Sequence, residues 1–155
     1  MKTRRLGKTD LQVSEIGFGG EWLERHPEEE SIELIHYASS KGINILDCWM
    51  ADPKSRDIIG KGIKDNRSQW FIQGHIGSTW KNEQYFRTRD MKYVRPAFED
   101  LLKRLQTDYI DLGMIHYVDS EEEWEQIQHS DYLDYIMELK DKGVIRHIGM
   151  SSHNP

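Results

Sequence analysis

Apolar residues follow two spacings along this chain, and stretches with one spacing alternate with stretches of the other. Short runs of β-branched and aromatic residues that end at a glycine or a polar residue predict strands. Longer stretches with apolar residues three or four positions apart predict helices. The predicted strands span 11–17, 43–47, 70–75, 109–116 and 144–151, and the predicted helices span 27–42, 55–64, 90–105 and 121–142.

The order of these elements predicts the fold class. Strands alternate with helices from end to end, which favours an α/β fold with a parallel sheet and crossover helices. The segment Gly17-Phe18-Gly19-Gly20 lacks the third glycine of the dinucleotide fingerprint, and this disfavours a doubly wound nucleotide-binding sheet. No low-complexity linker and no shift in composition divides the chain, so we predict a single domain over residues 1–155.

Residues 78–89 form the longest stretch without either spacing, and we predict a polar loop there. Long loops on compact scaffolds are often functional. This segment is therefore a candidate functional loop.

Composition narrows the range of partners. The 155 residues carry 21 Lys and Arg against 27 Asp and Glu, a formal net charge of -6. Nucleic-acid binding needs a basic footprint and anionic membranes attract basic surfaces, so we predict neither partner. Cys48 is the only cysteine, which excludes an internal disulfide, and no apolar run is long enough to span a bilayer. With no secretory signal visible, we expect a cytoplasmic protein.

Polar residues collect where the predicted strands end. In a parallel barrel all of these ends lie on one face, where such enzymes place their sites. A single histidine at a strand end means little, but several ends that deliver acids and imidazoles together predict a catalytic rim. The residues concerned are Glu21, Asp47, Cys48, His75, His116 and His153.

Four segments carry a more specific signal. They are residues 4–19 (RRLGKTDLQVSEIGFG), 42–47 (GINILD), 105–116 (LQTDYIDLGMIH) and 143–151 (GVIRHIGMS). In this order they resemble the opening hairpin with the first strand, and then the second, fourth and fifth strands, of bacterial aldo-keto reductases. The resemblance implies the N-terminal half of a (β/α)8 TIM barrel, with about five parallel strands, four crossover helices and an N-terminal β-hairpin.

The resemblance also implies a chemistry. Aldo-keto reductases reduce small carbonyl compounds with NADPH or NADH, using a tyrosine acid, a lysine that lowers its pKa, an aspartate that holds the lysine, and a histidine that orients the carbonyl. Asp47 and His116 stand at the aspartate and histidine positions, whereas Asp52 replaces the tyrosine and His75 the lysine. This altered tetrad resembles that of a subgroup from anaerobes. It predicts a variant in which His75 or His116 donates the proton and Asp47 orients the donor.

The cofactor positions that the resemblance implies lie at the two ends of the sheet. Gly20 follows the first strand, and Ser151 matches a serine that follows the family's fifth strand. Ser152 stands where an asparagine is usual. In the family, later loops hold most of the dinucleotide. We therefore expect these 155 residues, taken alone, to bind NADP or NAD weakly and to be inactive.

One alternative is a half barrel without enzymatic activity. Its first and fifth strands would be open edges, which proteins seldom leave bare. A second copy, or a missing C-terminal half, would cover them. The hydrophobic share of 37%, low for a fully enclosed core, fits a chain with a surface left for such a partner.

Another alternative is a metal site. Asp47, His75 and His116, with His153 or Cys48, are good ligands for zinc or iron. Ligands on separate strands offer no spacing signature, however, and we assign no metal ligand from the sequence.

Overall fold

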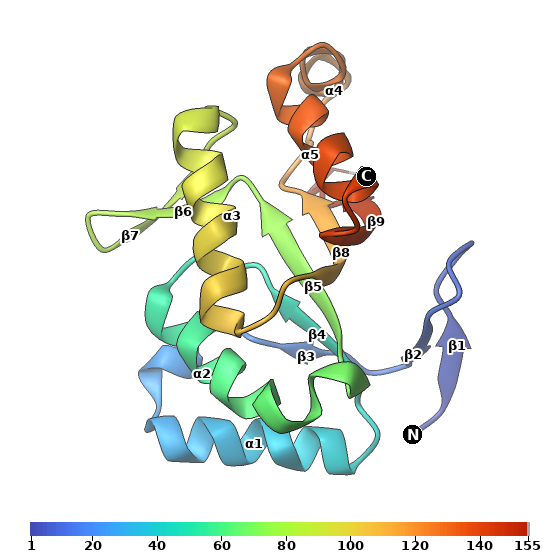
Figure 1. Ribbon diagram of the computed structural model, residues 1–155, viewed down its shortest axis with the longest axis vertical. Coiled ribbons are helices and arrows are strands. Elements are labelled where there is room, and N and C mark those ends of the chain that lie inside the picture. Colours follow the sequence, from blue (N-terminus) through green and yellow to red (C-terminus); the bar gives the residue numbers. More distant parts are fainter. Residues whose placement is uncertain (155) are drawn as a thin grey trace.

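A parallel sheet of five strands forms the centre of the fold, in the order β3-β4-β5-β8-β9 (Figure 1). The computed structural model describes residues 1–154. All four pairings within the sheet are parallel. The strands are β3 Phe18–Gly19, β4 Ile45–Cys48, β5 Phe71–Ile76, β8 Ile110–Ile115 and β9 Ile145–Met150. The predicted α/β class and the partial barrel are confirmed.

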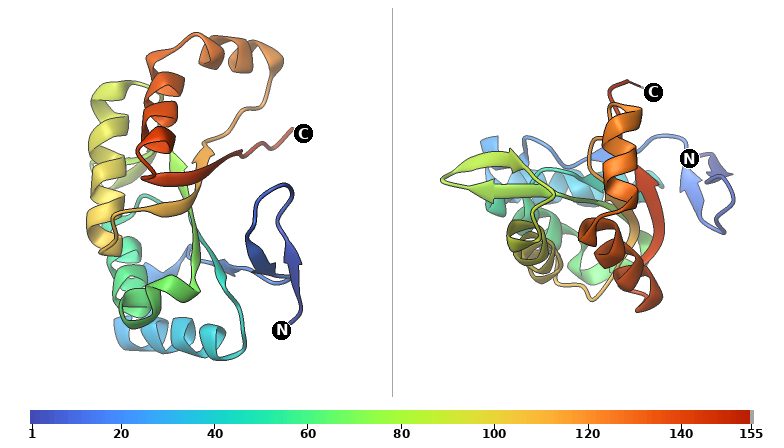
Figure 2. Two further views of the ribbon diagram at one scale, coloured as in Figure 1. Left: turned by 45° about the vertical axis from the view of Figure 1, so that its right-hand side comes forward. Right: turned by 90° about the horizontal axis from the view of Figure 1, so that it is seen from above.

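Helices connect successive strands and cover one side of the curved sheet (Figure 2). They are α1 Glu28–Ser40, α2 Pro53–Ile63, α3 Met91–Leu105, α4 Glu121–Gln128 and α5 Asp131–Asp141, with short 3-10 segments η1 Leu23–Arg25 and η2 Lys64–Gln69. None of the helices within residues 1–154 has the length and apolar character needed to cross a bilayer. Because the five strands are all parallel, their carboxyl ends lie on one rim.

The main core lies between the sheet and the helices. Ile35 of α1, Leu46 of β4, Ile72 of β5, Leu101 of α3 and Ile136 of α5 are all fully buried there. Burial of such a side chain contributes about 1.5–3 kcal/mol. This core therefore fixes the curvature of the sheet and, with it, the positions of the strand ends.

A second, smaller cluster lies on the opposite face of the sheet. The hairpin of β1 Thr3–Arg5 and β2 Gln12–Ser14 places Leu11 and Val13 against Leu112 of β8. Asn44 anchors the hairpin, since its side chain accepts a hydrogen bond from Ser14 N at 2.7 Å and donates one to Gln12 O at 2.9 Å. The predicted N-terminal hairpin is therefore present, and it packs against the sheet at β8.

The predicted strand at 11–17 was wrong in its extent, because this segment divides between two pairings. Residues Gln12–Ser14 pair with β1, and the chain then bends before β3 pairs with β4. The bend is held by Ser14 Oγ, which donates to Ile16 O at 2.7 Å. Hydrophobic alternation does not reveal which partner a strand chooses, so the pattern merged the two.

The predicted loop at 78–89 was also wrong. Ser78–Lys81 (β6) and Gln84–Arg87 (β7) form an antiparallel hairpin that extends away from the sheet (Figure 1). Asn82 and Glu83 make the turn with φ of 51° and 61°, the left-handed conformation of tight two-residue hairpin turns. The polar residues hid the strand signal, which the aromatic residues on either side of the turn do carry.

The single helix predicted at 121–142 is two helices. Ser130 has extended φ and ψ of −117° and 151° and caps α5, with its hydroxyl accepting from Leu133 N. Ser120 caps α4 in the same way. Serine competes for backbone hydrogen bonds in this manner, so it ends one helix and begins the next. The other elements lie within a few residues of their predicted bounds.

Candidate active site

The candidate site lies where β4, β5 and β8 end. In the sheet Asp47 pairs with Gln73, and His75 pairs with Met114. Paired residues, and residues two apart on one strand, share a face, so Asp47, Gln73 and His75 lie on the inner side. Cys48 faces the other way and is buried in the main core. The parallel register therefore brings an acid, an amide and an imidazole together.

His75 stands between Asp47 and His116. Its Nε2 lies 3.3 Å from Asp47 Oδ1, and its Nδ1 lies 2.9 Å from Nδ1 of His116. Gln73 Nε2 donates to the same Asp47 oxygen at 3.0 Å. Both imidazoles are buried, whereas a third of the Asp47 side chain is exposed. The three residues form a line of contacts that runs from the solvent edge inward.

The His116 ring is enclosed by aromatic side chains. Tyr117 stacks on one side at a centroid distance of 4.0 Å, and Trp49 lies nearly parallel at 6.1 Å. Tyr85 of β7 approaches edge-on, and its Oη lies 2.7 Å from His116 Nε2. The side chain of Trp49 is itself held by Glu21, which accepts from its indole N–H at 3.2 Å. As a result His116 is only 1% exposed.

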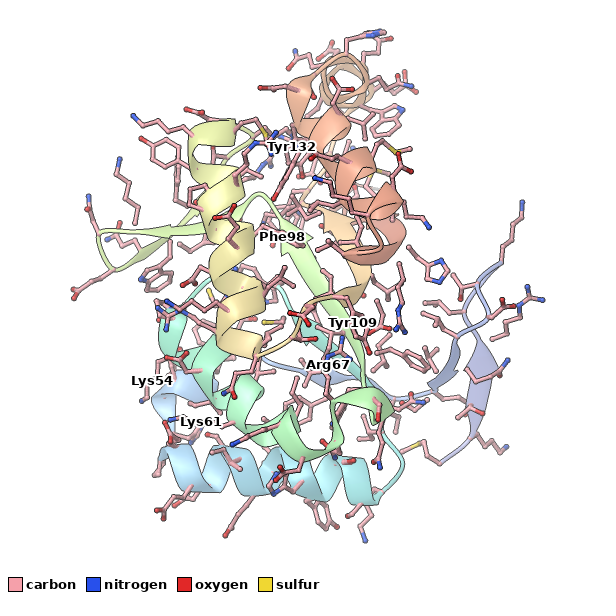
Figure 3. All side chains as sticks on the ribbon, viewed as in Figure 1. Lys54, Lys61, Arg67, Phe98, Tyr109 and Tyr132 are labelled. Carbon is pink, nitrogen blue, oxygen red and sulfur yellow. The ribbon has the colours of Figure 1, made fainter. Side chains whose placement is uncertain are left out.

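A buried tyrosine, Tyr132, contacts the strand ends that carry His75 and His116. Tyr132 of α5 points towards the ends of β5 and β8 and is fully buried (Figure 3). Its hydroxyl donates to the carbonyl of Ile76 and accepts from His116 N at 3.4 Å. The hydroxyl therefore links the two strand ends that carry His75 and His116, and it fixes the spacing between them.

The surroundings keep His116 and Tyr85 uncharged near neutral pH. Burial, together with the positive charges of His75, Arg87 and Arg89, lowers the pKa of His116 to about 3. Burial raises the pKa of the Tyr85 phenol to about 12. Tyr85 therefore keeps its proton, and His116 carries a hydrogen on only one ring nitrogen.

Two arginines fix the hairpin that carries Tyr85. Arg87 of β7 and Arg89, which precedes α3, both pair with Glu123 of α4, the second at 2.7 Å. Arg89 also donates to the backbone carbonyl of Tyr117. These contacts tie the hairpin to the loop after β8, so the position of Tyr85 relative to His116 is set by ion pairs rather than by the sheet.

The predicted catalytic residues separate into two groups. Asp47, His75 and His116 are brought together, as the strand ends implied. Asp52 instead caps α2, where its carboxylate accepts from Ser55 N at 2.8 Å. Among residues 1–154 no hydrogen bond joins Asp52 to either histidine.

The predicted cofactor positions are partly engaged within the protein. At Gly20 an added Cβ would lie 2.6 Å from Ile59 Cδ1 and 2.8 Å from Asp47 O, so the glycine lets β3 lie against β4. Ser152 Oγ donates to Asp119 at 3.3 Å. Ser151 Oγ accepts from Tyr117 N at 3.0 Å, and in the described part of the chain its own hydrogen has no acceptor.

The candidate metal ligands do not form a cluster. Within the described residues no group of three or more His, Cys, Asp or Glu side chains is arranged to hold an ion. Both ring nitrogens of His75 face other side chains, Cys48 lies on the opposite face, and His153 binds Asp119 at 3.2 Å. The candidate ligands form a line or point apart, whereas coordination needs them to converge.

Sequence reasoning missed three residues of the site. Gln73 contacts Asp47, Tyr117 stacks on His116, and Tyr85 bonds to His116. The alternation along β5 would have placed Gln73 on the same face as His75. Tyr85 was hidden inside the segment predicted as a loop, and no local pattern indicates a contact across the 31 positions that separate it from His116.

Fold and site together define the class. A parallel barrel sheet that gathers an aspartate and two histidines at its carboxyl rim is typical of a TIM-barrel enzyme, since such enzymes build their sites there. The sequence profile of the Aldo/keto reductase family matches residues 15–155, and the chain belongs to that family.

Comparisons with individual proteins are consistent with this family. The chain is 34% identical to the aldo-keto reductase YhdN of Bacillus subtilis, over 98% of this chain and 47% of that protein. It is 31% identical to the uncharacterized oxidoreductase YqkF of the same organism, over 100% of this chain and 50% of that one. The holo form of aldo-keto reductase AKR11C1 from Bacillus halodurans superposes with a TM-score of 0.83 at 31% identity, covering 100% of this chain and 51% of that structure. The chain thus spans about half the length of these relatives.

Proposed function

We propose that this chain carries the proton-handling part of an NAD(P)H-linked reductase that acts on small carbonyl compounds. One observation supports this most: Asp47, His75 and His116 are joined in a line of contacts at the catalytic rim of a family barrel. Carbonyl reduction places negative charge on the carbonyl oxygen, which therefore needs a nearby proton. A buried imidazole pair next to a carboxylate is suited to supply one.

In this proposal two histidines replace the family's usual acid and lysine. Asp47 lies 3.3 Å from His75 Nε2 and can accept a hydrogen from it, as it would from a lysine. His116 stays neutral and passes a proton between its two nitrogens by releasing one hydrogen and accepting another. Asp52 caps α2, and we assign it no share in the proton transfer.

The dinucleotide, when bound, would supply the hydride that reduces the carbonyl carbon. Of the candidate residues, Ser151 fits it best, because its hydroxyl hydrogen is available to an amide oxygen at the rim. Gly20 follows β3, the strand at the opposite edge of the sheet. The hydroxyl of Ser152 already donates a hydrogen bond to Asp119. A hollow of 720 Å³ beside Met150 and Ser152 leaves space at the carboxyl end of β9.

The test compares the 155-residue chain with the product of the complete reading frame. We expect the product of the complete frame to oxidise NADPH or NADH in the presence of small aldehydes. The 155 residues alone should bind the dinucleotide weakly and show no turnover. Replacement of His75 by Ala should abolish turnover, and replacement of the exposed His36 of α1 by Ala should not. A complete product that neither binds a dinucleotide nor reduces any aldehyde would contradict the proposal.

A second candidate is a scaffold that associates with another chain. Ile148 and Met150 on the edge strand β9 are 36% and 50% exposed, although large apolar side chains are usually buried. Covering them with a second copy would bury apolar surface at the open edge. Sedimentation of the 155-residue protein tests this idea, and a monomer at all concentrations would exclude it.

A further inference from the structure

We propose that Tyr85 is the residue that gives its proton to the substrate, and that the histidines resupply it. The inference rests on the proposed function and goes beyond it, because neither the altered tetrad nor the strand-end pattern points to this tyrosine. Its hydroxyl makes the 2.7 Å contact with His116 Nε2 described above. It would restore a phenol to a site whose family position for tyrosine holds Asp52.

The enclosure of His116 is the first argument. In the family the histidine itself contacts the carbonyl, but here Nε2 is occupied by Tyr85 and the ring is 1% exposed. The rings of Trp49 and Tyr117 both lie nearly parallel to it, at centroid distances of 6.1 Å and 4.0 Å. A substrate therefore cannot reach Nε2 unless the tyrosine is displaced. Tyr85 is only partly buried, so this side chain is nearer to the surface than the imidazole of His116 to which it bonds.

The second argument is that Tyr85 is held in place on several sides. Its ring meets that of Trp49 edge-on at a centroid distance of 5.3 Å. In the hairpin it pairs with Trp80, and Arg87, two residues further along β7, is tied to Glu123. A side chain that merely filled space would not need this support. A proton donor does, because its hydroxyl must stay within hydrogen-bond reach of both partners.

The hydrogen bonds allow two proton arrangements that differ by one proton. In the first, His75 is protonated on both nitrogens and donates to Asp47 and to His116 Nδ1. His116 then donates from Nε2 to Tyr85, whose hydroxyl hydrogen is free to point at a substrate. In the second, Tyr85 donates to His116 Nε2, His116 donates from Nδ1 to His75, and His75 donates from Nε2 to Asp47. The contacts of His75 with Asp47 and with His116, and the contact of His116 with Tyr85, each have one donor and one acceptor in both arrangements.

Reduction converts the first arrangement into the second. A bound reduced nicotinamide would supply the hydride for the new C–H bond, and the carbonyl π electrons would move to oxygen. The Tyr85 O–H bond breaks as the alkoxide takes its proton. The phenolate takes the Nε2 proton of His116, which in turn takes the Nδ1 proton of His75. One hydride and one proton are consumed, and His75 ends neutral until solvent reprotonates it.

The decisive variant is Tyr85→Phe, made in the product of the complete reading frame. We expect kcat for aldehyde reduction to fall by about 10²–10⁴-fold, the usual contribution of a general acid. Dinucleotide affinity should stay unchanged. Tyr93→Phe is the matched control, because this tyrosine of α3 contacts Phe86 and Lys81 of the same hairpin but has no bond to the site. Its kcat should equal that of the parent.

Incorporation of 3-fluorotyrosine at position 85 provides a second variant that keeps both ring and hydroxyl. It should retain kcat within about tenfold of the parent, since it preserves the acid with only a changed proton affinity. Nitrogen-15 NMR of the imidazoles gives a readout independent of turnover. Loss of the Tyr85 hydroxyl should shift the His116 Nε2 resonance in Tyr85→Phe and leave it unmoved in Tyr93→Phe.

The outcomes separate the two proposals. If the parent protein reduces no aldehyde, the proposed function fails and the role of Tyr85 fails with it. If the parent is active and Tyr85→Phe keeps its kcat, only the role of Tyr85 is refuted. If Tyr85→Phe raises kcat or lowers KM, the tyrosine blocks the site rather than serving it, and the inference is again overturned.

Discussion

The Nδ1 atoms of His75 and His116 face each other at 2.9 Å. A hydrogen bond between two imidazole nitrogens needs one donor and one acceptor, so only one of the two carries a hydrogen. The protonation of each ring therefore depends on the other. This coupling distinguishes the site from a family member with a lysine at the position of His75, because a lysine donates and never accepts.

The acid stability of the protein should depend on His116. In the unfolded chain the pKa of a histidine is near 6.5. In the folded protein, burial and nearby positive charges lower the pKa of His116 to about 3. The unfolded state thus binds more protons between these values. Stability should be fully present above pH 6.5 and should fall with decreasing pH, by up to about 1.4 kcal/mol per pH unit from this group.

Urea unfolding at several pH values measures this dependence. His116→Gln should reduce the slope of unfolding free energy against pH below 6.5, whatever its effect on stability at pH 8. His36→Ala, on the exposed face of α1, should leave the slope unchanged. Equal slopes for the parent and His116→Gln would show that His116 takes up its proton over the same pH range in the folded and unfolded states.

Asp111 should contribute more to stability than to the site. Its carboxylate is 1% exposed and pairs with Arg67 at 3.2 Å and Arg146 at 3.1 Å. It also accepts from Ile72 N at 3.0 Å, which links β8 to β5. Figure 3 shows Arg67 against the ring of Tyr109. Removal of the Asp111 carboxylate would leave the Arg67 guanidinium beside this ring without its acidic partner.

We therefore expect Asp111→Ala to lower the free energy of unfolding by about 3–5 kcal/mol, the usual effect of breaking a buried ion pair. Asp108→Ala, three positions earlier and exposed, should change it by less than about 0.5 kcal/mol. Chemical denaturation of both variants measures these changes in the free energy of unfolding. Similar losses in the two variants would mean that the ion pairs of Asp111 contribute little to the free energy of unfolding.

Gly60 lies where α2 packs against the C-terminal end of α3. A Cβ at this position would lie 2.0 Å from the carbonyl oxygen of Arg104, so the two backbones would have to separate. At Gly62 the nearest atom, at 2.7 Å, is the terminal methyl of Ile35, which has more freedom to move. The two glycines therefore form a matched pair within one helix.

Gly60→Ala should destabilise the protein by about 1–3 kcal/mol, as overpacking usually does, despite the better helix propensity of alanine. Gly62→Ala should cost less. Thermal unfolding of the two variants compares them directly. A Gly60→Ala protein as stable as Gly62→Ala would show that α2 and α3 separate without penalty.

Much of the site follows from local pattern. The strand ends located Asp47, His75 and His116 on one rim because parallel strands share a direction. The same reasoning failed for residues 78–89, where alternation was masked by polar residues, and it missed the break before α5, where the hydroxyl of Ser130 competes with the helix. Asp52 shows a related limit, because its position relative to Asp47 does not reveal that it caps α2.

The sequence by itself determined the order of strands and helices, the family, and the presence of two histidines where the rim forms. Hydrophobic spacing and short motifs carry that information, because they depend on neighbours a few residues away. Only the tertiary structure decided that the two imidazoles share a hydrogen bond, and that Tyr85 closes over His116. Those contacts depend on sheet register, on side-chain rotamers and on ion pairs between the hairpin and α4, and none of these is a property of a local segment.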